Sequence, residues 1–508
     1  MLKSAALPGC LLVALFAGSL SFGCGSSTPA TSSDWRTSTP EEQGIDSEAL
    51  ADLIERIDRE SLPVDSLLIA RNGALVLDAY FFPYLGDRPH DVRSVTKSIT
   101  STLVGIAVDE GLLAVDQPIA SLFPTIDASK QDIELGHLLS MTSGLACSAT
   151  QGEQELNAMI ESENFVEYAL DLPVAVPPGT TFAYCSPGSH LLSAMLTQVT
   201  GMSAHDFARA RLFEPLGIAE STWLTDPQGV SRGWGDLQLR PRDMAKIGQL
   251  FLDGGEWKGT RIVSADWVEQ ATRRVVTAGA DGTGYGYQWW LPSGPPDGIY
   301  EAVGLGGQAI VVWPENEFVV VFTGRGVDAR GAITPLLVEA LKDKGPIEPN
   351  PAGNARLDVA ISQALEPPPA QPVRELPEAA RLMSNRLYRL DDNPFDTRCV
   401  LLRFDSASDV AFELTTTSGT FEMRVGMDGV PRFSDDSPTG IPIGLVGEWI
   451  DPEVFRLLYD EVSGSNHLRI QVTIGEGADT IEVEFSDPAE SFPTTTVPGT
   501  VVPSCDPA

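Results

Sequence analysis

The spacing of apolar and polar residues predicts a mixed helix and strand domain over residues 35–344, here called the N-terminal domain. Residues 47–57 and 94–110 have the apolar spacing and length of helices. Four strands are expected, at 66–70, 74–78, 309–313 and 318–323, the first two joined by an Asn-Gly turn. Because strands stand at both ends with helices between them, we expect one antiparallel α/β sheet built from both halves of the domain.

The pattern changes after this domain. Residues 345–378 are rich in proline and predict a linker with one short helix at 354–365. Residues 379–508, here called the β domain, contain short alternating apolar runs separated by turn residues. The expected strands are 399–404, 410–414, 420–425, 443–449, 455–459, 468–474 and 480–485. Such a series predicts a small all-β barrel or sandwich.

The beginning of the chain has the pattern of an export signal. Residues 1–23 carry one basic residue, Lys3, before an interrupted apolar run, which favours a secretion signal over a membrane-spanning helix. Cys24 opens a polar tether at 24–34, resembling a bacterial lipoprotein signal, although Ser21 stands where leucine is usual. We expect an exported cell-envelope protein, in the periplasm or outside, attached to the membrane only through lipid on Cys24. Cleavage and release is the alternative.

The charge balance and the cysteines narrow the possible partners. The chain has 34 basic and 70 acidic residues, a net charge of −36, which repels nucleic-acid phosphates and argues against nucleic-acid binding. Five histidines and no CxxC pair argue against a metal site, and no cofactor is expected. Apart from Cys10 in the signal and Cys24, four cysteines remain. In an oxidising compartment these four can form two disulfides in three ways, and we favour pairing within domains. These cysteines are Cys147, Cys185, Cys399 and Cys505.

A candidate nucleophile and base lie at the start of the long predicted helix. Ser94 and Lys97 are three residues apart, so a helix beginning near Ser94 would place both on one face. A serine hydroxyl needs a neighbour to take its proton, and burial favours the neutral, proton-accepting form of a lysine. The helix N-terminus would also favour negative charge on the serine oxygen. A serine and a lysine at this spacing occur by chance about as often as they form a catalytic pair.

Two further segments suit a hydrolytic site. Tyr184, with Ser186 two residues on, ends a turn-rich segment before a predicted helix, where its phenol could point into a cleft or simply pack at the helix entry. Leu305, Gly306, Gly307 and Gln308 lead into a predicted strand. Glycines there would let a strand edge approach a substrate and offer an N–H to an oxyanion, with a β-bulge or tight turn as the alternative.

In this order the three segments resemble the S-x-x-K, Y-x-N and K-T-G elements of serine β-lactamases and penicillin-binding proteins. The likeness covers about residues 35–344 and is closest to the branch with class C β-lactamases, family VIII carboxylesterases and 6-aminohexanoate-dimer hydrolases. Four other segments add to it, at 138–145, 213–218, 240–244 and 285–290. The resemblance implies an antiparallel sheet flanked by helices, with a helical subdomain. The β domain is similar to the barrel extension of some exported members.

The resemblance also implies the roles of the site residues. Ser94 would attack a carbonyl and form an acyl-enzyme, while Lys97 and Tyr184 would move the protons as a coupled pair. The backbone N–H groups of Ser94 and Gln308 would form the oxyanion hole. Trp234 and Trp289 could line the acyl pocket, with core packing as the alternative.

Two residues differ from those of the family's elements in a way that affects the expected substrate. Leu305 stands where β-lactamases have lysine, and Ser186 replaces the asparagine of the second element, so a cation and an amide donor for a β-lactam are missing. A small-molecule ester or amide is therefore the expected substrate. The alternatives are D,D-peptidase or weak β-lactamase activity on cell-wall peptides, or a non-catalytic cell-surface binding lipoprotein. The sequence leaves the oligomeric state open.

Overall fold

A computed structural model describes residues 35–147, 154–326, 328–408, 410–487 and 493–505. Residues 35–508 form one compact unit. The predicted signal peptide, the tether and Cys24 lie outside the described residues. Within the described ranges, no helix combines the length and the apolar character that crossing a membrane requires.

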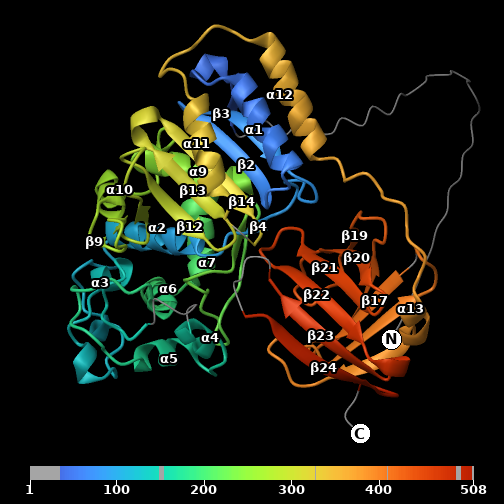
Figure 1. The fold of residues 1–508 in the computed structure, drawn as a ribbon. Coiled ribbons are helices and arrows are strands. Elements are labelled where there is room, and N and C mark those ends of the chain that lie inside the picture. The colour runs from blue at the N-terminus through green and yellow to red at the C-terminus, as the bar shows by residue number, and fades with distance from the viewer. Residues whose placement is uncertain (1–34, 148–153, 327, 409, 488–492, 506–508) are drawn as a thin grey trace, which may run out of the picture. The chain divides into compact units, whose positions relative to one another are not determined.

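The N-terminal domain is organised around one sheet drawn from both of its ends (Figure 1). Within the described residues it has nine strands, in the order β1-β3-β2-β14-β13-β12-β11-β10-β9, antiparallel except for the β1–β3 pair. The strands are β1 (Arg36–Thr37), β2 (Val64–Arg71), β3 (Ala74–Tyr80), β9 (Val276–Thr277), β10 (Gly284–Tyr285), β11 (Trp290–Leu291), β12 (Tyr300–Gly304), β13 (Gln308–Trp313) and β14 (Phe318–Gly324). The long central strand β14 pairs with β2, so the two halves of the domain meet in this sheet, as predicted.

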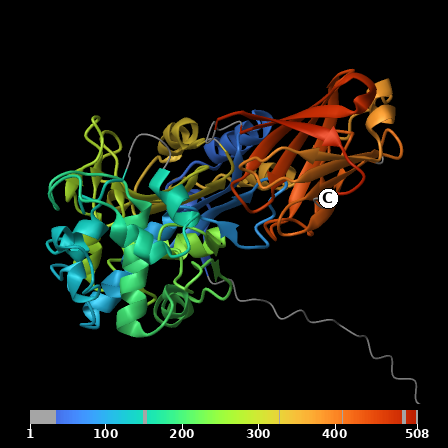
Figure 2. The same ribbon diagram turned by 90° about the horizontal axis from the view of Figure 1, so that it is seen from below.

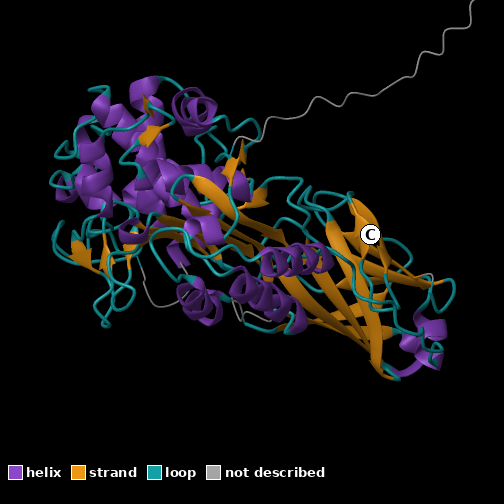
Figure 3. Ribbon diagram, turned by 90° about the horizontal axis from the view of Figure 1, so that it is seen from above, coloured by secondary structure: helices purple, strands orange, loops and turns teal. Residues whose placement is uncertain are grey.

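Alternating side chains of these strands enter two separate cores. Leu68 and Val321 face one core, shared with α2 (Val95–Asp109) and α9 (Pro241–Leu252). Leu67 and Phe322 face the other, shared with α1 (Ser47–Arg59) and α11 (Arg330–Ala340). Figure 3 shows helices on both sides of the strands. The sheet is thus covered on both faces, which places α2 and its first residues against the sheet.

The helical subdomain is formed by the segment between α2 and α9. Its α-helices are α3 (Leu135–Leu139), α4 (Gln154–Ile160), α5 (Phe165–Asp171), α6 (Ser186–Thr200), α7 (Ala204–Ala208) and α8 (Glu214–Leu216). Helix α10 (Ala265–Thr272) and the short strands β4 (His90–Asp91), β5 (Thr222–Trp223), β6 (Leu237–Leu239), β7 (Glu256–Trp257) and β8 (Thr260–Arg261) complete the domain. The almost wholly buried α6 packs in the same core as α2, so α6 links the subdomain to the sheet.

The β domain is a single antiparallel sheet that nearly closes on itself (Figure 2). Its ten described strands are β15 (Arg386–Leu390), β16 (Cys399–Phe404), β17 (Val410–Thr415), β18 (Thr420–Val425), β19 (Arg432–Ser434), β20 (Ile443–Asp451), β21 (Val454–Glu461), β22 (His467–Ile474), β23 (Thr480–Ser486) and β24 (Thr495–Val501). Gly426, just after β18, bridges to Val446 of β20. Helix α13 (Glu378–Met383) packs into the core of this domain. The structure thus has the barrel-like form expected from the sequence.

The segment predicted as a linker contains a helix that packs on the N-terminal domain. Helix α12 (Pro351–Ala364) shares the α1 core through Leu357 and Ala360. Arg356 forms ion pairs with three carboxylates of α1, at N–O distances of 2.8, 2.6 and 2.7 Å, from Glu48, Asp52 and Glu55 respectively. The predicted short helix is present, but residues 351–364 belong structurally to the N-terminal domain.

Both disulfides join cysteines of the same domain, as favoured from the sequence. Cys147 pairs with Cys185 at a Cα–Cα distance of 5.4 Å. Cys399 pairs with Cys505 at 6.0 Å. The first bond ties the segment after α3 to the residue before α6, and the second ties β16 to the segment after β24.

Candidate active site

Ser94 is the residue immediately before α2, and Lys97 lies one turn into that helix. The Lys97 Nζ donates a hydrogen bond to the Ser94 Oγ at 2.9 Å. Arg93 has a positive φ of 47°, a conformation that L-residues adopt rarely, and this turn presents Ser94 at the helix N-terminus. The predicted serine–lysine pair is therefore in hydrogen-bond contact.

The amine of Lys97 is buried among neutral groups. Its side chain is 1% exposed, and its Nζ also donates to the Trp234 carbonyl oxygen at 3.0 Å. The same nitrogen lies 4.7 Å from the centroid of the Tyr184 ring. The structure thus gathers Ser94, Lys97 and Tyr184, which the sequence separates by up to 90 residues, at one point.

Tyr184 is positioned by the loop at residues 138–145. The Ala183 N–H donates to the Met141 carbonyl at 2.9 Å, and the Gly179 N–H donates to the Thr142 carbonyl at 2.7 Å. The following residue, Cys185, is fixed by its disulfide. This segment, singled out by its resemblance to the family, therefore orients the residue next to the nucleophilic pair.

Gln288 is a buried residue that connects the elements carrying the first two motifs. Ser98 of α2 donates to its carbonyl oxygen at 2.6 Å, and Ser189 of α6 donates to its Oε1 at 3.0 Å. Its Nε2 donates to the carbonyls of Leu138 and Leu139 at 3.1 and 2.9 Å. Satisfied buried polar networks of this kind fix the relative positions of the segments they join.

The third motif lies beside the nucleophile. A Cβ added to Gly304 would lie 2.5 Å from the Val92 carbonyl oxygen and 3.0 Å from the Arg93 Cβ, so only glycine allows this approach. Gly306 and Gly307 have φ values of 82° and 90°. The Gln308 side chain exchanges hydrogen bonds with the backbone of Gly324, fixing the start of β13. Leu305, in contrast, is 59% exposed.

The structure distinguishes among the tryptophans considered for the pocket. Trp289 is fully buried against Phe251 and Tyr300, which corresponds to the core-packing alternative. The Trp234 ring is buried against Phe165 and His190, and its contact with the site is the carbonyl that receives the Lys97 hydrogen bond.

Trp290, which the sequence reasoning passed over, lies at the site. It is half-buried and stacks on Tyr184 with ring centroids 5.9 Å apart and an interplanar angle of 23°. The strand that it opens, β11, has only two residues, so the sequence carried no alternation that could have distinguished it from Trp289. Ser186, in the second motif, is buried in the first turn of α6.

The residues before the nucleophile are held by the β domain. The Asp91 N–H donates to the Ser463 carbonyl oxygen at 2.8 Å. The Arg93 guanidinium pairs with Asp91 at 2.9 Å, donates to the Ser465 hydroxyl, and reaches the Asn466 Oδ1 at 3.1 Å. Sequence reasoning missed this arrangement, which joins residues about 370 positions apart.

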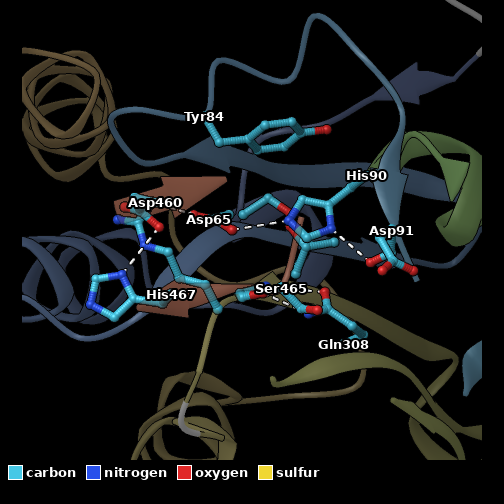
Figure 4. Close-up of polar contacts among 12 residues, drawn as sticks. Asp65, Tyr84, His90, Asp91, Gln308, Asp460, Ser465 and His467 are labelled. Carbon is cyan, nitrogen blue, oxygen red and sulfur yellow. Dashed lines mark hydrogen bonds and ion pairs between the residues drawn. The ribbon is translucent and has the colours of Figure 1, made fainter. Parts of the chain in front are cut away.

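A second set of polar contacts runs behind this turn (Figure 4). The His90 ring lies between the Asp91 carbonyl oxygen, 2.8 Å from Nδ1, and the Asp65 carboxylate, 3.0 Å from Nε2. Arg325 bridges Asp65 and Asp460 at 3.2 and 3.1 Å. Asp460 lies on β21 of the β domain, and the other groups belong to the N-terminal domain. The network therefore connects the nucleophile turn with the β domain.

Comparison with known proteins agrees with this geometry. The Beta-lactamase family model matches residues 50–337, more than half of the chain. A 6-aminohexanoate-dimer hydrolase from Paenarthrobacter ureafaciens is 26% identical over 314 residues, covering 56% of this chain and 78% of that protein. Penicillin-binding protein 4 from Amycolatopsis lactamdurans is 30% identical over 236 residues, covering 39% of this chain and 61% of that protein, less than two thirds of its length.

A solved structure from Bacillus anthracis, provisionally named as a 6-aminohexanoate-dimer hydrolase, shares the fold. It has a TM-score of 0.50 and 18% identity, covering 65% of this chain and 85% of that one. With Ser94, Lys97 and Tyr184 gathered at one site and the family model matched across most of the N-terminal domain, the chain belongs to the Beta-lactamase family of serine hydrolases.

Proposed function

We propose that this protein forms an acyl-enzyme on Ser94 and cleaves esters or small amides. The observation that carries the proposal is the 2.9 Å contact between the Lys97 Nζ and the Ser94 Oγ, within the range required of a nucleophile and its general base. In its unprotonated form, the Lys97 Nζ accepts the hydroxyl proton as the Ser94 Oγ bonds to the substrate carbonyl carbon. The carbonyl π electrons move to the oxygen, which becomes the oxyanion.

Collapse of this intermediate releases the alcohol or amine of the substrate. The leaving group takes a proton from Lys97 or from the Tyr184 phenol, which act as a coupled pair. Water then attacks the acyl carbon, and the carboxylic acid leaves while Ser94 regains its proton. The N–H groups of Ser94 and Gln308 stabilise the oxyanion in both steps, a role supported by the approach of Gly304 to the backbone before Ser94.

The third motif and the neighbouring charges favour an ester or small amide over a β-lactam. Leu305 presents an exposed apolar side chain where a cation would be needed to hold a substrate carboxylate. Arg93 is close by, but Asp91 already pairs with it. The relative named for the 6-aminohexanoate dimer supports a linear amide. The penicillin-binding relative makes a D,D-peptidase or weak β-lactamase the second candidate.

We also propose export with lipid on Cys24.

Mass spectrometry after brief exposure to a probe tests the proposal. The wild-type chain would be incubated separately with p-nitrophenyl butyrate, a cephalosporin and a fluorophosphonate, and digested to locate any adduct. We expect adducts on the Ser94 peptide, with ester turnover and little reaction with the cephalosporin. Fast, stable acylation by the cephalosporin would instead favour the D,D-peptidase class.

The matched variants are Ser94→Ala and Ser101→Ala. Ser101 is buried in the same helix, and its hydroxyl has no hydrogen-bond partner within the described residues. Its replacement should leave both labelling and turnover unchanged, whereas Ser94→Ala should abolish both. Absence of adducts with all three probes in a folded wild-type protein would favour a non-catalytic binding protein.

A further inference from the structure

The β domain contains an internal cavity that the proposed reaction does not use. Its volume is about 180 Å³, and its walls are mostly apolar. They come from strands around the barrel-like sheet and include Val400, Phe412, Ile470 and Val483. An apolar cavity of about 150 Å³ is known to stay dry and to bind a molecule of the size of benzene. The cavity is therefore large enough for a small organic ligand.

One acidic side chain in this apolar wall lacks a full set of hydrogen bonds. Glu461, the last residue of β21, is 2% exposed and lines the cavity. Its Oε2 accepts a hydrogen bond from the Asn466 Nδ2 at 3.0 Å. Its Oε1 has no partner at hydrogen-bond geometry among the described residues. Burial raises the pKa of this carboxyl, and the side chains of Asn466 and Thr439 oppose that shift.

A buried acceptor without a partner is destabilising, and more so when it carries charge. A ligand with a hydrogen-bond donor would remove that penalty, while its apolar part would fill the remaining space. Buried charges in proteins are paired or hydrogen-bonded for this reason. The shape and polarity of the cavity are therefore complementary to an amphiphile with a single donor group.

We propose that the β domain binds a small amphiphilic molecule, an alkyl chain or ring with an amine or hydroxyl donor, with the donor on Glu461 and the apolar part inside the barrel. A carboxylate ligand facing the ionised Glu461 would place two acceptors against each other and is disfavoured by repulsion. The cavity lining does not include Ser94, and binding does not depend on the proposed hydrolase reaction, although Asn466 contacts both Glu461 and Arg93.

Calorimetric titration of the intact protein with hexylamine, hexanol and hexanoate tests this assignment. We expect binding of hexylamine and hexanol and none of hexanoate. Glu461→Gln, which keeps the shape of the side chain, should weaken hexylamine binding at least tenfold and reduce the discrimination against hexanoate. Glu482→Gln removes the same charge from an exposed position on β23 and should leave all three titrations unchanged.

Two further measurements separate this site from others. Ser94→Ala should bind hexylamine as wild type does, because the cavity does not include the active site. Val483→Phe should fill the cavity and abolish binding of both ligands. If that variant does not fold, Leu468→Phe at a half-buried position of the wall gives the same test. Absence of binding by wild type, or equal hexylamine affinity in Glu461→Gln, would overturn the proposal.

Discussion

Replacing Lys97 with methionine should separate catalysis from stability. Methionine is unbranched and close to lysine in length, so it fills the same buried space without an amine. In the structure Lys97 makes two hydrogen bonds through its Nζ, to the Ser94 hydroxyl and the Trp234 carbonyl. The variant therefore removes the proposed proton acceptor and leaves the surrounding packing nearly unchanged.

The size of each effect can be worked out. General-base catalysis contributes about 10²–10⁴-fold in rate, so kcat/KM should fall by at least about 100-fold, equivalent to about 2.7 kcal/mol in the barrier. For stability, methionine makes neither hydrogen bond of the Lys97 Nζ, and each lost hydrogen bond costs about 0.5–1.5 kcal/mol. The unfolding free energy should therefore fall by about 1–3 kcal/mol.

Both quantities are measurable on the same preparation. Hydrolysis of p-nitrophenyl butyrate gives kcat/KM, and denaturant unfolding followed by circular dichroism gives the unfolding free energy. Lys246→Met provides a control, because Lys246 is also a buried lysine, 2% exposed, but lies on α9 and donates to the Gly217 carbonyl. It should retain activity. Near-normal turnover in a folded Lys97→Met variant would refute the assignment of Lys97 as the base.

Three other perturbations test the supports of the site. Arg93→Ala should lower kcat/KM about tenfold and the unfolding free energy by about 1–2 kcal/mol, since it removes the contacts with Ser465 and Asn466 and leaves the turn, among the described residues, only the Asp91 N–H bond to the β domain; kinetics and denaturant unfolding measure these changes. Replacing Cys147 and Cys185 with serine should cost about 4 kcal/mol for a loop of 38 residues and reduce activity, by the same two assays. Stability should fall as the pH drops from about 7 to 5, measured as the thermal midpoint, because burial lowers the pKa of His190 against the opposing effect of its hydrogen bond with Asp226.

The sign of the pH effect follows from proton binding. The pKa of His190 lies below its unfolded value, so the folded state binds fewer protons in this range. Its contribution is complete above the unfolded value of about 6.5 and is lost as the pH falls. The pKa of Asp226 is also lowered, but an unfolded aspartate titrates near about 3.9, so Asp226 contributes only below this range. A thermal midpoint that stays constant down to about pH 5 would contradict this reasoning, and the His190→Asn variant should show a smaller slope.

Controls exist for the other two perturbations. Arg381 is 73% exposed and pairs only loosely with Glu378, at 3.6 Å, so Arg381→Ala should change neither activity nor stability. Removal of the Cys399–Cys505 bond should lower stability by about 5 kcal/mol for its longer loop of 106 residues while leaving the active site unaltered. Equal loss of activity from both disulfides would show that the first has no special role at Tyr184.

Local sequence was enough to predict the parts of the site that are fixed by helix and strand geometry. Ser94 and Lys97 come together because α2 begins between them, and three residues make about one helical turn. The strands β13 and β14 followed from their apolar runs and intervening turn. Within-domain pairing of the cysteines followed from their positions on either side of the linker.

Contacts between distant segments could not be predicted in this way. The Trp234 carbonyl meets Lys97 only because the segment before β6 crosses α2, and local periodicity carries no signal for that crossing. The same holds for Gln288, whose five hydrogen bonds reach three separate segments. The choice between Trp289 and Trp290 depended on which side of a very short strand faces the site, and a strand of two residues is too short to show alternation.

The docking of α12 determines where this protein can be cut into independent pieces. A fragment ending at Lys344 would lack the helix whose Leu357 and Ala360 cover α1, and the newly wetted apolar surface would promote aggregation. A fragment ending just after Leu365 would keep that cover, so the natural point of excision is the extended stretch between α12 and α13, in the second half of the proline-rich segment. Even this longer fragment would lose Ser465 and Asn466, and with them two of the groups that hold Arg93. An excised enzyme should therefore fold readily yet work below the rate of the whole chain.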